Sequence, residues 1–261
     1  MTSLDRRREI LSLVRELKSV SIQKLQVRLD ASPATLRRDL AFLESERKII
    51  RTHGGAALPE YVTDEPSFSR RQKVAPAKKW AIGQEAAQLD GLRGAVFVDS
   101  GTTCLELGKR LFERGDLRVY TNSLPLLTVA ANMSCEVVSL GGTLRPASCA
   151  MVGGLSREWL RKLHFDWAFI GASGLSATEG CFTTEPLEAE VKANILNSST
   201  RRVLLCDSDK WQHPSAMRFA RWNAFDTWVV DSGLPETEFI PSLTRADLRV
   251  IRANQTESHD A

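Results

Sequence analysis

A dense cluster of small polar residues lies in the middle of the chain, between a short apolar run at residues 95–98 and a helical pattern at 104–111. The cluster reads Asp99-Ser100-Gly101-Thr102-Thr103. Backbone N–H groups at a helix start, aided by hydroxyls and the helix dipole, can bind a phosphate. The cluster lacks the Lys of a Walker A loop and the G-x-G-x-x-G of a dinucleotide site. It predicts a site for a small phosphorylated metabolite, with a plain capped turn as the alternative.

Similar clusters end the other short apolar runs of the second half of the chain. They are Thr121-Asn122-Ser123, Gly141-Gly142-Thr143, Gly171-Ala172-Ser173-Gly174, Asp207-Ser208-Asp209-Lys210 and Asp231-Ser232-Gly233. A helical stretch usually follows each cluster. Alternating strands and helices predict a Rossmann-like α/β domain, with a mostly parallel sheet and helices on both faces. Ligands of such sheets bind beyond the carboxyl ends of the strands, so we expect these clusters to lie together.

Charged residues near the clusters are candidates for the effector site. Lys210 follows a predicted strand and could supply a positive charge, although a surface lysine is the alternative. Arg145 fits either a phosphate ligand or a solvated loop residue. The remaining candidates lie on or near a helix predicted to begin around residue 186. They are Glu185 and Lys192, with Glu188 and Glu190 between them in the sequence. A spacing of four residues would also let Glu188 and Lys192 pair on the surface of that helix.

The N-terminal region has the pattern of a helix-turn-helix. Apolar residues at positions 10, 14 and 17 predict a helix over 6–17, and Ser21 can cap a second short helix. After a break, Ser32 can cap a third helix with Pro33 at its first position. This helix places Ala34, Thr35, Arg37 and Arg38 near its start. Because the second helix of the motif enters the major groove, these side chains are candidates for contacting DNA.

A hairpin is predicted directly after these helices. The segments at residues 48–52 and 56–58 flank His53-Gly54-Gly55, whose glycine pair is typical of a tight turn. A hairpin here would make a winged helix, with Arg51 and His53 reaching the DNA backbone or minor groove. The alternative is a three-helix interaction domain whose arginines are solvated. We favour DNA binding because the caps, spacing, basic residues and hairpin agree.

Charge is distributed unevenly along the 261 residues. Residues 1–79 contain 17 Lys and Arg against 10 Asp and Glu, whereas the remainder contains 18 against 22. This asymmetry favours a head that binds a polyanion. Residues 59–79 contain three prolines and little periodicity, which is typical of an extended linker. We therefore expect a DNA-binding domain at 1–58, a linker at 59–75 and an α/β sensor domain at 76–261.

Composition argues against a membrane or secreted protein. No apolar run reaches the roughly 18 residues that span a bilayer, and residues 1–9 are too charged for a signal peptide. The five cysteines are scattered without a C-x-x-C pair. They indicate reduced thiols in a cytoplasmic protein and neither a disulfide framework nor a zinc site. We expect no metal and no cofactor.

Both regions resemble the DeoR-type bacterial repressors, also called the DeoR/GlpR family. In the head, the matching strings are Ser32-Pro33-Ala34-Thr35-Leu36-Arg37-Arg38-Asp39-Leu40 and Arg51-Thr52-His53-Gly54-Gly55-Ala56. Ala31 stands where the family usually has Val. In the body, the clusters that end at residues 103, 123, 142, 174 and 210 match the family's sensor domain. That domain is similar in fold to type A ribose-5-phosphate isomerases.

The resemblance implies a sequence-specific DNA-binding regulator, expected to repress sugar-metabolism genes until a phosphorylated sugar binds its C-terminal domain. A homodimer or homotetramer would read repeated half-sites. The isomerases carry acidic residues after their Gly-Ala pair, where this chain has Ser173 and Gly174. A site without that carboxylate is expected to bind but not to catalyse. The alternatives are an isomerase-like enzyme with an accessory DNA-binding domain, served by Glu185, Glu188 or Glu190, and a regulator that responds to a partner protein.

Overall fold

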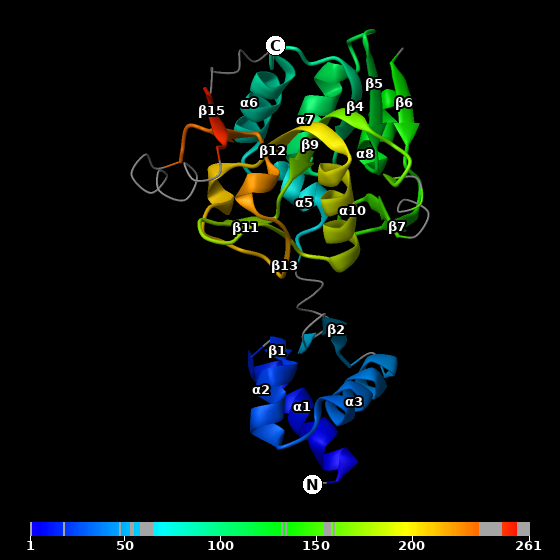
Figure 1. The fold of residues 1–261 in the computed structure, drawn as a ribbon, viewed down its shortest axis with the longest axis vertical. Coiled ribbons are helices and arrows are strands. Elements are labelled where there is room, and N and C mark those ends of the chain that lie inside the picture. Colours follow the sequence, from blue (N-terminus) through cyan, green and yellow to red (C-terminus); the bar gives the residue numbers. More distant parts are fainter. Residues whose placement is uncertain are drawn as a thin grey trace. The chain divides into compact units, whose positions relative to one another are not determined.

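The computed structural model describes residues 2–17, 19–46, 48–52, 55–57, 65–131, 133, 135–153, 158, 160–234 and 247–254. The chain forms two compact units, Met1–Pro66 and Ser67–Ala261, which we call the head and the body. Figure 1 shows both units. None of the helices in the described part of the chain is long and apolar enough to cross a membrane.

The head contains three helices and a small antiparallel sheet. The helices are α1 (Ser3–Leu17), α2 (Ile22–Leu29) and α3 (Pro33–Ser45). The strands are β1 (Ser19–Ser21), β2 (Ile50–Thr52) and β3 (Gly55–Ala57), in the order β1-β3-β2. The predicted helices and hairpin are confirmed. Strand β1 was not predicted, because three residues between two helices show no periodicity.

The apolar stripes of the three helices meet in one small core. Its buried members include Ile10, Val14, Leu25, Leu36, Leu40 and Leu43. The predicted caps also form, since Ser21 Oγ accepts a hydrogen bond from the N–H of Lys24 and Ser32 Oγ accepts one from Thr35, each at 3.2 Å. Such a cap typically stabilises a helix by about 1 kcal/mol. The turn between α2 and α3 passes through Asp30 in the left-handed conformation, with φ 45°.

The body contains a seven-stranded sheet in which every pair of neighbours is parallel. Its order is β15-β14-β12-β9-β4-β5-β6. The strands are β4 (Gly94–Val98), β5 (Leu117–Thr121), β6 (Glu136–Ser139), β9 (Phe165–Gly171), β12 (Ser199–Leu205), β14 (Thr227–Asp231) and β15 (Arg249–Ala253). This confirms the predicted Rossmann-like fold. Strand β15 was not predicted.

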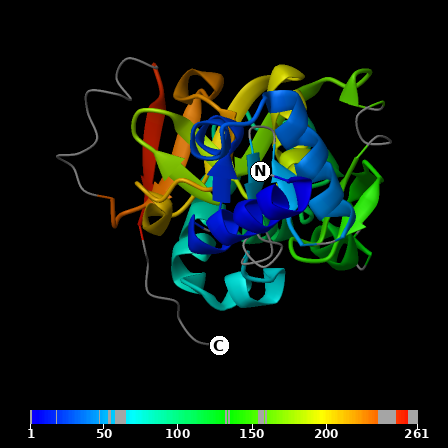
Figure 2. The ribbon, with the colours of Figure 1, turned by 90° about the horizontal axis from the view of Figure 1, so that it is seen from below.

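Helices cover both faces of this sheet. Helices α6 (Pro76–Ala87), α7 (Thr102–Leu111) and α8 (Leu124–Ala130) share one apolar core with one face. Helix α10 (Pro186–Asn197) shares a second core with the other face. Figure 2 shows α6 in cyan and α10 in yellow on opposite sides of the sheet.

The expected linker at 59–75 differs from the structure at its C-terminal end. Residues Phe68–Lys73 form helix α5, and Phe68 is buried in the core of the body. Ser67 caps this helix by accepting a hydrogen bond from the N–H of Arg70. The body therefore begins at Ser67. The sequence did not predict this helix, because the prolines nearby favour an extended linker. Its six residues, of which Phe68 is buried, are also too few to show helical periodicity.

Two smaller antiparallel sheets complete the body. Strands β10 (Gly174–Ser176), β11 (Gly180–Thr183) and β13 (Met217–Ala220) lie in the order β10-β11-β13. Strands β7 (Thr143–Arg145) and β8 (Ala150–Val152) form a hairpin that we call the arm, residues 143–152. Short 3-10 turns follow β12 at Ser208–Lys210 (η1) and β13 at Trp222–Ala224 (η2). These strands are too short for alternation to reveal them.

The strand order reverses beside β4. The chain passes from β4 outward through β5 to β6, then returns to place β9 on the other side of β4. A reversal of this kind opens a crevice at the carboxyl ends of the two central strands, where ligands of doubly wound sheets bind. Asp99 follows β4 and Gly171 ends β9, so this crevice lies at two of the predicted clusters.

Candidate nucleic-acid interface and effector site

Helix α3 presents the predicted DNA-binding residues at its start. Arg37 and Arg38 are exposed, as is Ala34. Ser32 and Thr35 instead hydrogen-bond within the helix start. Their side-chain oxygens lie 2.9 Å apart, and Ser32 Oγ caps the helix by accepting from the N–H of Thr35. Ser21 likewise caps α2. The two arginines are thus the side chains of this helix that remain available for phosphates or base edges.

A buried ion pair fixes α3 against α1. Asp39 lies on the inner face of α3 and accepts hydrogen bonds from Arg6 Nε at 2.6 Å and Arg7 Nε at 2.8 Å. Its side chain is 3% exposed. Sequence reasoning missed this role, although a signal existed: Asp39 falls three residues after Leu36, within the buried stripe. The pair orients the helix so that its neighbours Arg37 and Arg38 face outward.

The wing is described only in part. Arg51 lies on β2, where it is paired in register with Ala56 of β3. His53 lies outside the described residues. The predicted DNA contacts of Arg51 and His53 therefore remain predictions.

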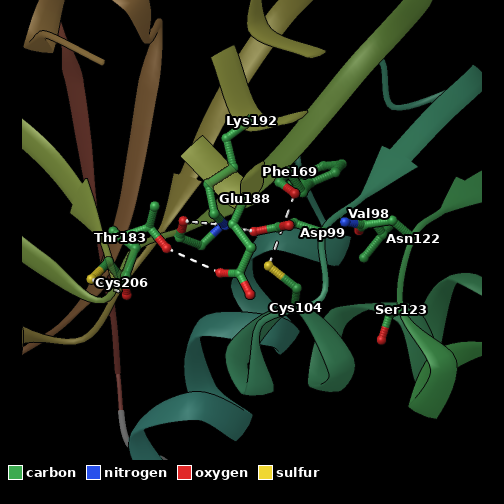
Figure 3. Close-up of polar contacts among 12 residues, drawn as sticks. Val98, Asp99, Cys104, Asn122, Ser123, Phe169, Thr183, Glu188, Lys192 and Cys206 are labelled. Atoms are coloured by element: carbon green, nitrogen blue, oxygen red, sulfur yellow. Dashed lines mark hydrogen bonds and ion pairs between the residues drawn. The ribbon is translucent and has the colours of Figure 1, made fainter. Parts of the chain in front are cut away.

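The crevice of the body contains a buried lysine. Lys192 of α10 donates hydrogen bonds to the Asp99 carboxylate and, at 3.1 Å, to the carbonyl oxygen of Gly171. The N–H of Gly171 also donates to Asp99, at 2.9 Å. Burial alone would lower the pKa of Lys192, but the charges of Asp99 and Glu188 raise it. Figure 3 shows the Lys192 ammonium group pointing toward Asp99, with Glu188 beside it. The lysine stays charged within the protein.

The prediction that Glu188 and Lys192 pair on the surface of their helix is wrong. Both are buried, each about 5% exposed, and each binds a different element. Glu188 accepts from Arg145 of β7 at 3.0 Å and from the hydroxyl of Thr183 at 3.1 Å. The reason is that α10 lies between the sheet and the strands β8, β11 and β13, so this face points inward.

The structure also shows which groups two other charged candidates contact. Arg145 is not a solvated loop residue, because its side chain is 15% exposed and ion-paired with Glu188. Glu185 is the N-cap of α10 and accepts a hydrogen bond from the N–H of Glu188 at 2.9 Å. Glu185 therefore has a structural role that its sequence position before Pro186 also fits.

The start of α7 has the features expected of an anion site. Its N-cap is Gly101, which has no side chain to accept a hydrogen bond from the first turn. Ser100, Thr102 and Thr103 surround this turn and are buried. Beneath it lies Cys104, where burial raises the pKa of the thiol and keeps it protonated. Because the first turn of a helix has N–H groups without helical partners, α7 offers them to an anion.

The cluster after β5 is partly structural. Thr121 donates to the carbonyl oxygen of Val98 at 2.6 Å and accepts from the N–H of Ser123 at 3.0 Å. Ser123 in turn caps α8. Asn122 donates from Nδ2 to the carbonyl oxygen of Met151 in the arm, at 3.3 Å. Thr121 and Ser123 thus hold β5 and α8 beside β4, and Asn122 connects them to the arm.

In the other clusters, glycine is required either by the backbone conformation or by a close backbone contact. Gly141 and Gly142 have φ values of 67° and 120°, which favour glycine. At Gly174, a Cβ atom would lie 2.0 Å from the carbonyl oxygen of His213. Ser173 donates its N–H to Phe182, and the carbonyl oxygen of Ala172 accepts from the thiol of Cys206. No side chain fits at position 174 without a shift of the backbone.

Charged residues also gather after β12. Asp207 is buried, and burial raises the pKa of its carboxyl, opposed by the charges of Lys210 and Lys79. Sequence reasoning missed Lys78 and Lys79 at the start of α6. Lys78 donates to Asp209 at 2.7 Å, and buried Lys79 donates to backbone carbonyls before its helix. Lys210 thus lies with Asp207 and this lysine pair, and the only sequence signal was two adjacent lysines.

Comparisons with known proteins agree with this architecture. A family model described as the DeoR C terminal sensor domain matches residues 74–232, and one described as the DeoR-like helix-turn-helix domain matches residues 6–62. The fold and these matches define a two-domain, DNA-binding transcription regulator. The chain belongs to the DeoR family.

Three relatives match most of the chain. It is 33% identical over 254 residues to the uncharacterized HTH-type transcriptional regulator YgbI of Escherichia coli, covering 97% of this chain and 99% of that protein. It is 32% identical to the HTH-type transcriptional repressor GlcR of Bacillus subtilis, covering 96% of each. It is 30% identical to the glycerol-3-phosphate regulon repressor of Haemophilus influenzae, covering 82% and 83%.

A solved structure of ribose 5-phosphate isomerase A from Methanocaldococcus jannaschii is also similar. It covers 51% of this chain and 53% of its own, with 17% identity and a TM-score of 0.37.

Proposed function

We propose that this regulator represses genes of sugar or polyol metabolism, and that a phosphorylated sugar bound in the body releases it from its operator. We place it in the cytoplasm, with the DNA that it binds. The glycerol-3-phosphate regulon repressor among its relatives supports this class of effector.

The observation that carries the proposal is the start of α7. A helix with no side-chain cap begins at the carboxyl end of β4, beside the point where the strand order reverses. A phosphate there would accept hydrogen bonds from the first N–H groups and gain from the helix dipole. Buried Lys192 lies close by and neutralises the carboxylate of Asp99, which would otherwise repel the phosphate.

We propose that the body binds the sugar without converting it. A proton-transfer enzyme needs a carboxylate close to the sugar carbons. The backbone contact at Gly174 leaves no room for one there, and Glu188 is held by Arg145 and Thr183. A turnover assay with pentose and hexose phosphates tests this. Isomerisation that is lost in a Glu190→Gln variant would show that the body is an enzyme.

The regulator would act as a homodimer or homotetramer, since helix-turn-helix proteins read paired half-sites. The effector must bind more tightly to the arrangement that spaces the heads wrongly for DNA. This oligomer is testable by light scattering with and without operator DNA. A monomer that binds one half-site with full affinity would contradict it.

A thermal-shift screen of the full chain tests the effector. Phosphorylated three- to six-carbon sugars and polyols are compared with their unphosphorylated parents and with inorganic phosphate. We expect one phosphorylated compound to raise the melting temperature, because ligand at a hundred times its Kd stabilises a protein by about 2.7 kcal/mol. The same compound should weaken a gel shift with operator DNA. If only a protein partner changes DNA binding, the proposal fails.

A pair of variants localises the effect. Thr102→Val removes a hydroxyl from the start of α7, whereas Thr227→Val makes the same change at the opposite, amino end of the sheet. We expect the inducer titration to shift to higher concentration for Thr102→Val alone, with DNA affinity unchanged in both. An unchanged titration for Thr102→Val would count against the phosphate site.

A further inference from the structure

One buried polar atom near the proposed effector site has no hydrogen-bond partner among the described residues. It is the side-chain oxygen Oδ1 of Asn122, whose residue is 2% exposed. Buried polar atoms are nearly always paired, because an unmade hydrogen bond leaves the cost of desolvation uncompensated. An atom of this kind therefore needs a partner that the chain does not supply.

The orientation of the Asn122 amide is fixed by its neighbour. Nδ2 donates to the carbonyl oxygen of Met151, which can only accept. The backbone of Asn122 is held to the same residue, since the N–H of Met151 donates to its carbonyl oxygen at 2.7 Å. Turning the amide over would place two oxygens together, so Oδ1 must face away from Met151. The missing partner is accordingly a hydrogen-bond donor.

Asn122 lies one strand from the proposed phosphate site. Val98 and Thr121 are paired in the parallel register of β4 and β5, so the next residues, Asp99 and Asn122, are neighbours at the carboxyl edge. Adjacent strands are about 4.8 Å apart. Figure 3 shows Asn122 beside Val98 and Asp99. A small molecule held by its phosphate at α7 would have its remaining atoms within reach of this position.

The arm covers Asn122 and has glycines at both ends. Gly141 and Gly142 precede it and Gly153 follows it, all with φ values between 67° and 120°. A Cβ at Gly141 would meet nothing within 4 Å, so backbone conformation, and not space, requires glycine there. Within the arm, Ser148 Oγ is a second buried polar atom without a partner among the described residues. The arm thus encloses polar atoms that a polar guest could satisfy.

We infer that Asn122 recognises a hydroxyl group of the effector, which the arm encloses. This inference rests on the proposed function. A phosphate oxygen would repel Oδ1 because both are acceptors, whereas a sugar or polyol hydroxyl donates. The two ends of the ligand are therefore told apart: the phosphate binds the start of α7, and a hydroxyl binds Oδ1 of Asn122. The effector class narrows to polyhydroxylated phosphate esters.

Calorimetry with matched probes tests this on the full chain. The probes are glycerol 3-phosphate, ribose 5-phosphate and glucose 6-phosphate, each with counterparts that lack one hydroxyl, and inorganic phosphate. We expect the wild type to bind one parent about tenfold more tightly than one of its deoxy counterparts, as one hydrogen bond supplies. In Asn122→Leu, which removes both polar atoms at similar size, that preference should disappear because only the parent loses affinity.

Two further variants separate recognition from structure. Asn122→Asp keeps the acceptor but not the bond to Met151, so it should retain the preference even if both affinities fall. Asn223→Ala, an exposed site on η2, should change neither. Equal losses for parent and deoxy probe in Asn122→Leu would show a structural role, and no loss would show that a bound water satisfies Oδ1. Either result overturns the inference.

The same measurements distinguish failure of the proposed phosphate site from failure of the inference about Asn122. If inorganic phosphate binds but no hydroxyl affects affinity in the wild type, the phosphate site stands and the role of Asn122 falls. If none of the probes binds, both fall. If Asn122→Leu does not fold, the retained or lost preference in Asn122→Asp decides the inference.

Discussion

The head and the body each hold a buried aspartate paired with basic side chains, but the two pairs differ in what surrounds them. In the head, Asp39 binds Arg6 and Arg7, whose side chains are 15% and 26% exposed. In the body, Asp99 binds Lys192, which is 6% exposed. In the head pair, the aspartate is buried but the arginines keep some exposure to solvent, and the pair joins two helices. The body pair lies in the crevice itself, so the same interaction would hold the fold and form part of the proposed binding site.

This difference predicts that substitutions affect DNA binding by the head and ligand binding by the body in different ways. The arginines of the head that we propose to contact DNA lie beside Asp39 in sequence but face outward, so contact and support would come from separate side chains. In the body, we propose that Lys192 serves both purposes. Mutations in the head should therefore separate stability from DNA binding, whereas mutations of the Asp99–Lys192 pair should change the stability of the body and its ligand binding together.

The largest effect is expected for Lys192→Met. This change leaves Asp99 buried without a counter-charge, which should lower the free energy of unfolding of the body by about 4 kcal/mol. All six tryptophans lie in the body, so urea unfolding followed by tryptophan fluorescence reports the body alone. The double variant Asp99→Asn, Lys192→Met should recover much of the loss. If the single variant unfolds at the wild-type urea concentration, the ion pair does not support the fold.

The next largest effect is expected for Arg37→Ala combined with Arg38→Ala. Each exposed arginine that contacts DNA should contribute about 1.5 kcal/mol, so operator affinity should fall roughly a hundredfold. If both contact phosphates, the salt dependence of binding should lose about two units of slope. Unfolding should stay as in the wild type, because neither side chain is buried. Retained gel-shift affinity would contradict the assignment of α3.

The same contrast explains what the sequence could predict. The helix-turn-helix was predictable because caps, stripes and arginines lie within one segment of residues 21–43. The strands of the parallel sheet were predictable because buried strands are continuous apolar runs. The pairing of Asp99 with Lys192 was not, because 93 positions separate them and only the packing of α10 on the sheet joins them. Glu188 and Lys192 have the spacing of a surface pair, and tertiary packing overrides that local pattern.

A smaller effect is expected for Asp39→Asn. The substitution keeps the shape but leaves Arg6 and Arg7 without a charged acceptor, at a cost of about 2 kcal/mol, since both arginines retain some hydration. Circular dichroism should show the head unfolding at lower urea, while the tryptophan transition of the body stays unchanged. Glu9→Gln, an exposed position of α1, is the control that removes a negative charge from the same helix and should be nearly neutral. A loss of DNA affinity without loss of stability would mean that Asp39 only aims the helix.

The smallest effect is a pH dependence specific to the body. Burial raises the pKa of Asp207 above its ordinary value, so the folded body binds a proton more tightly there than the unfolded chain does. The stability contributed by this group therefore falls as pH rises from about 4, the unfolded pKa, through the folded pKa. Asp207→Asn removes this penalty and should stabilise the body at neutral pH, with the gain vanishing below about pH 4.

Asp231→Asn provides the opposite sign. Hydrogen bonds from Ser208 and Gly233 and the charge of Lys78 outweigh burial and lower the pKa of Asp231. Asp231→Asn should thus destabilise the body at neutral pH and lose its effect as pH falls through the folded pKa of Asp231. Urea unfolding of the body, followed by tryptophan fluorescence from pH 8 down to about pH 2.5, measures both variants. The unfolding of the head, followed by circular dichroism, should not change in either variant. If Asp207→Asn destabilises the body at neutral pH, the charges of Lys79 and Lys210 hold its carboxylate more strongly than burial opposes it.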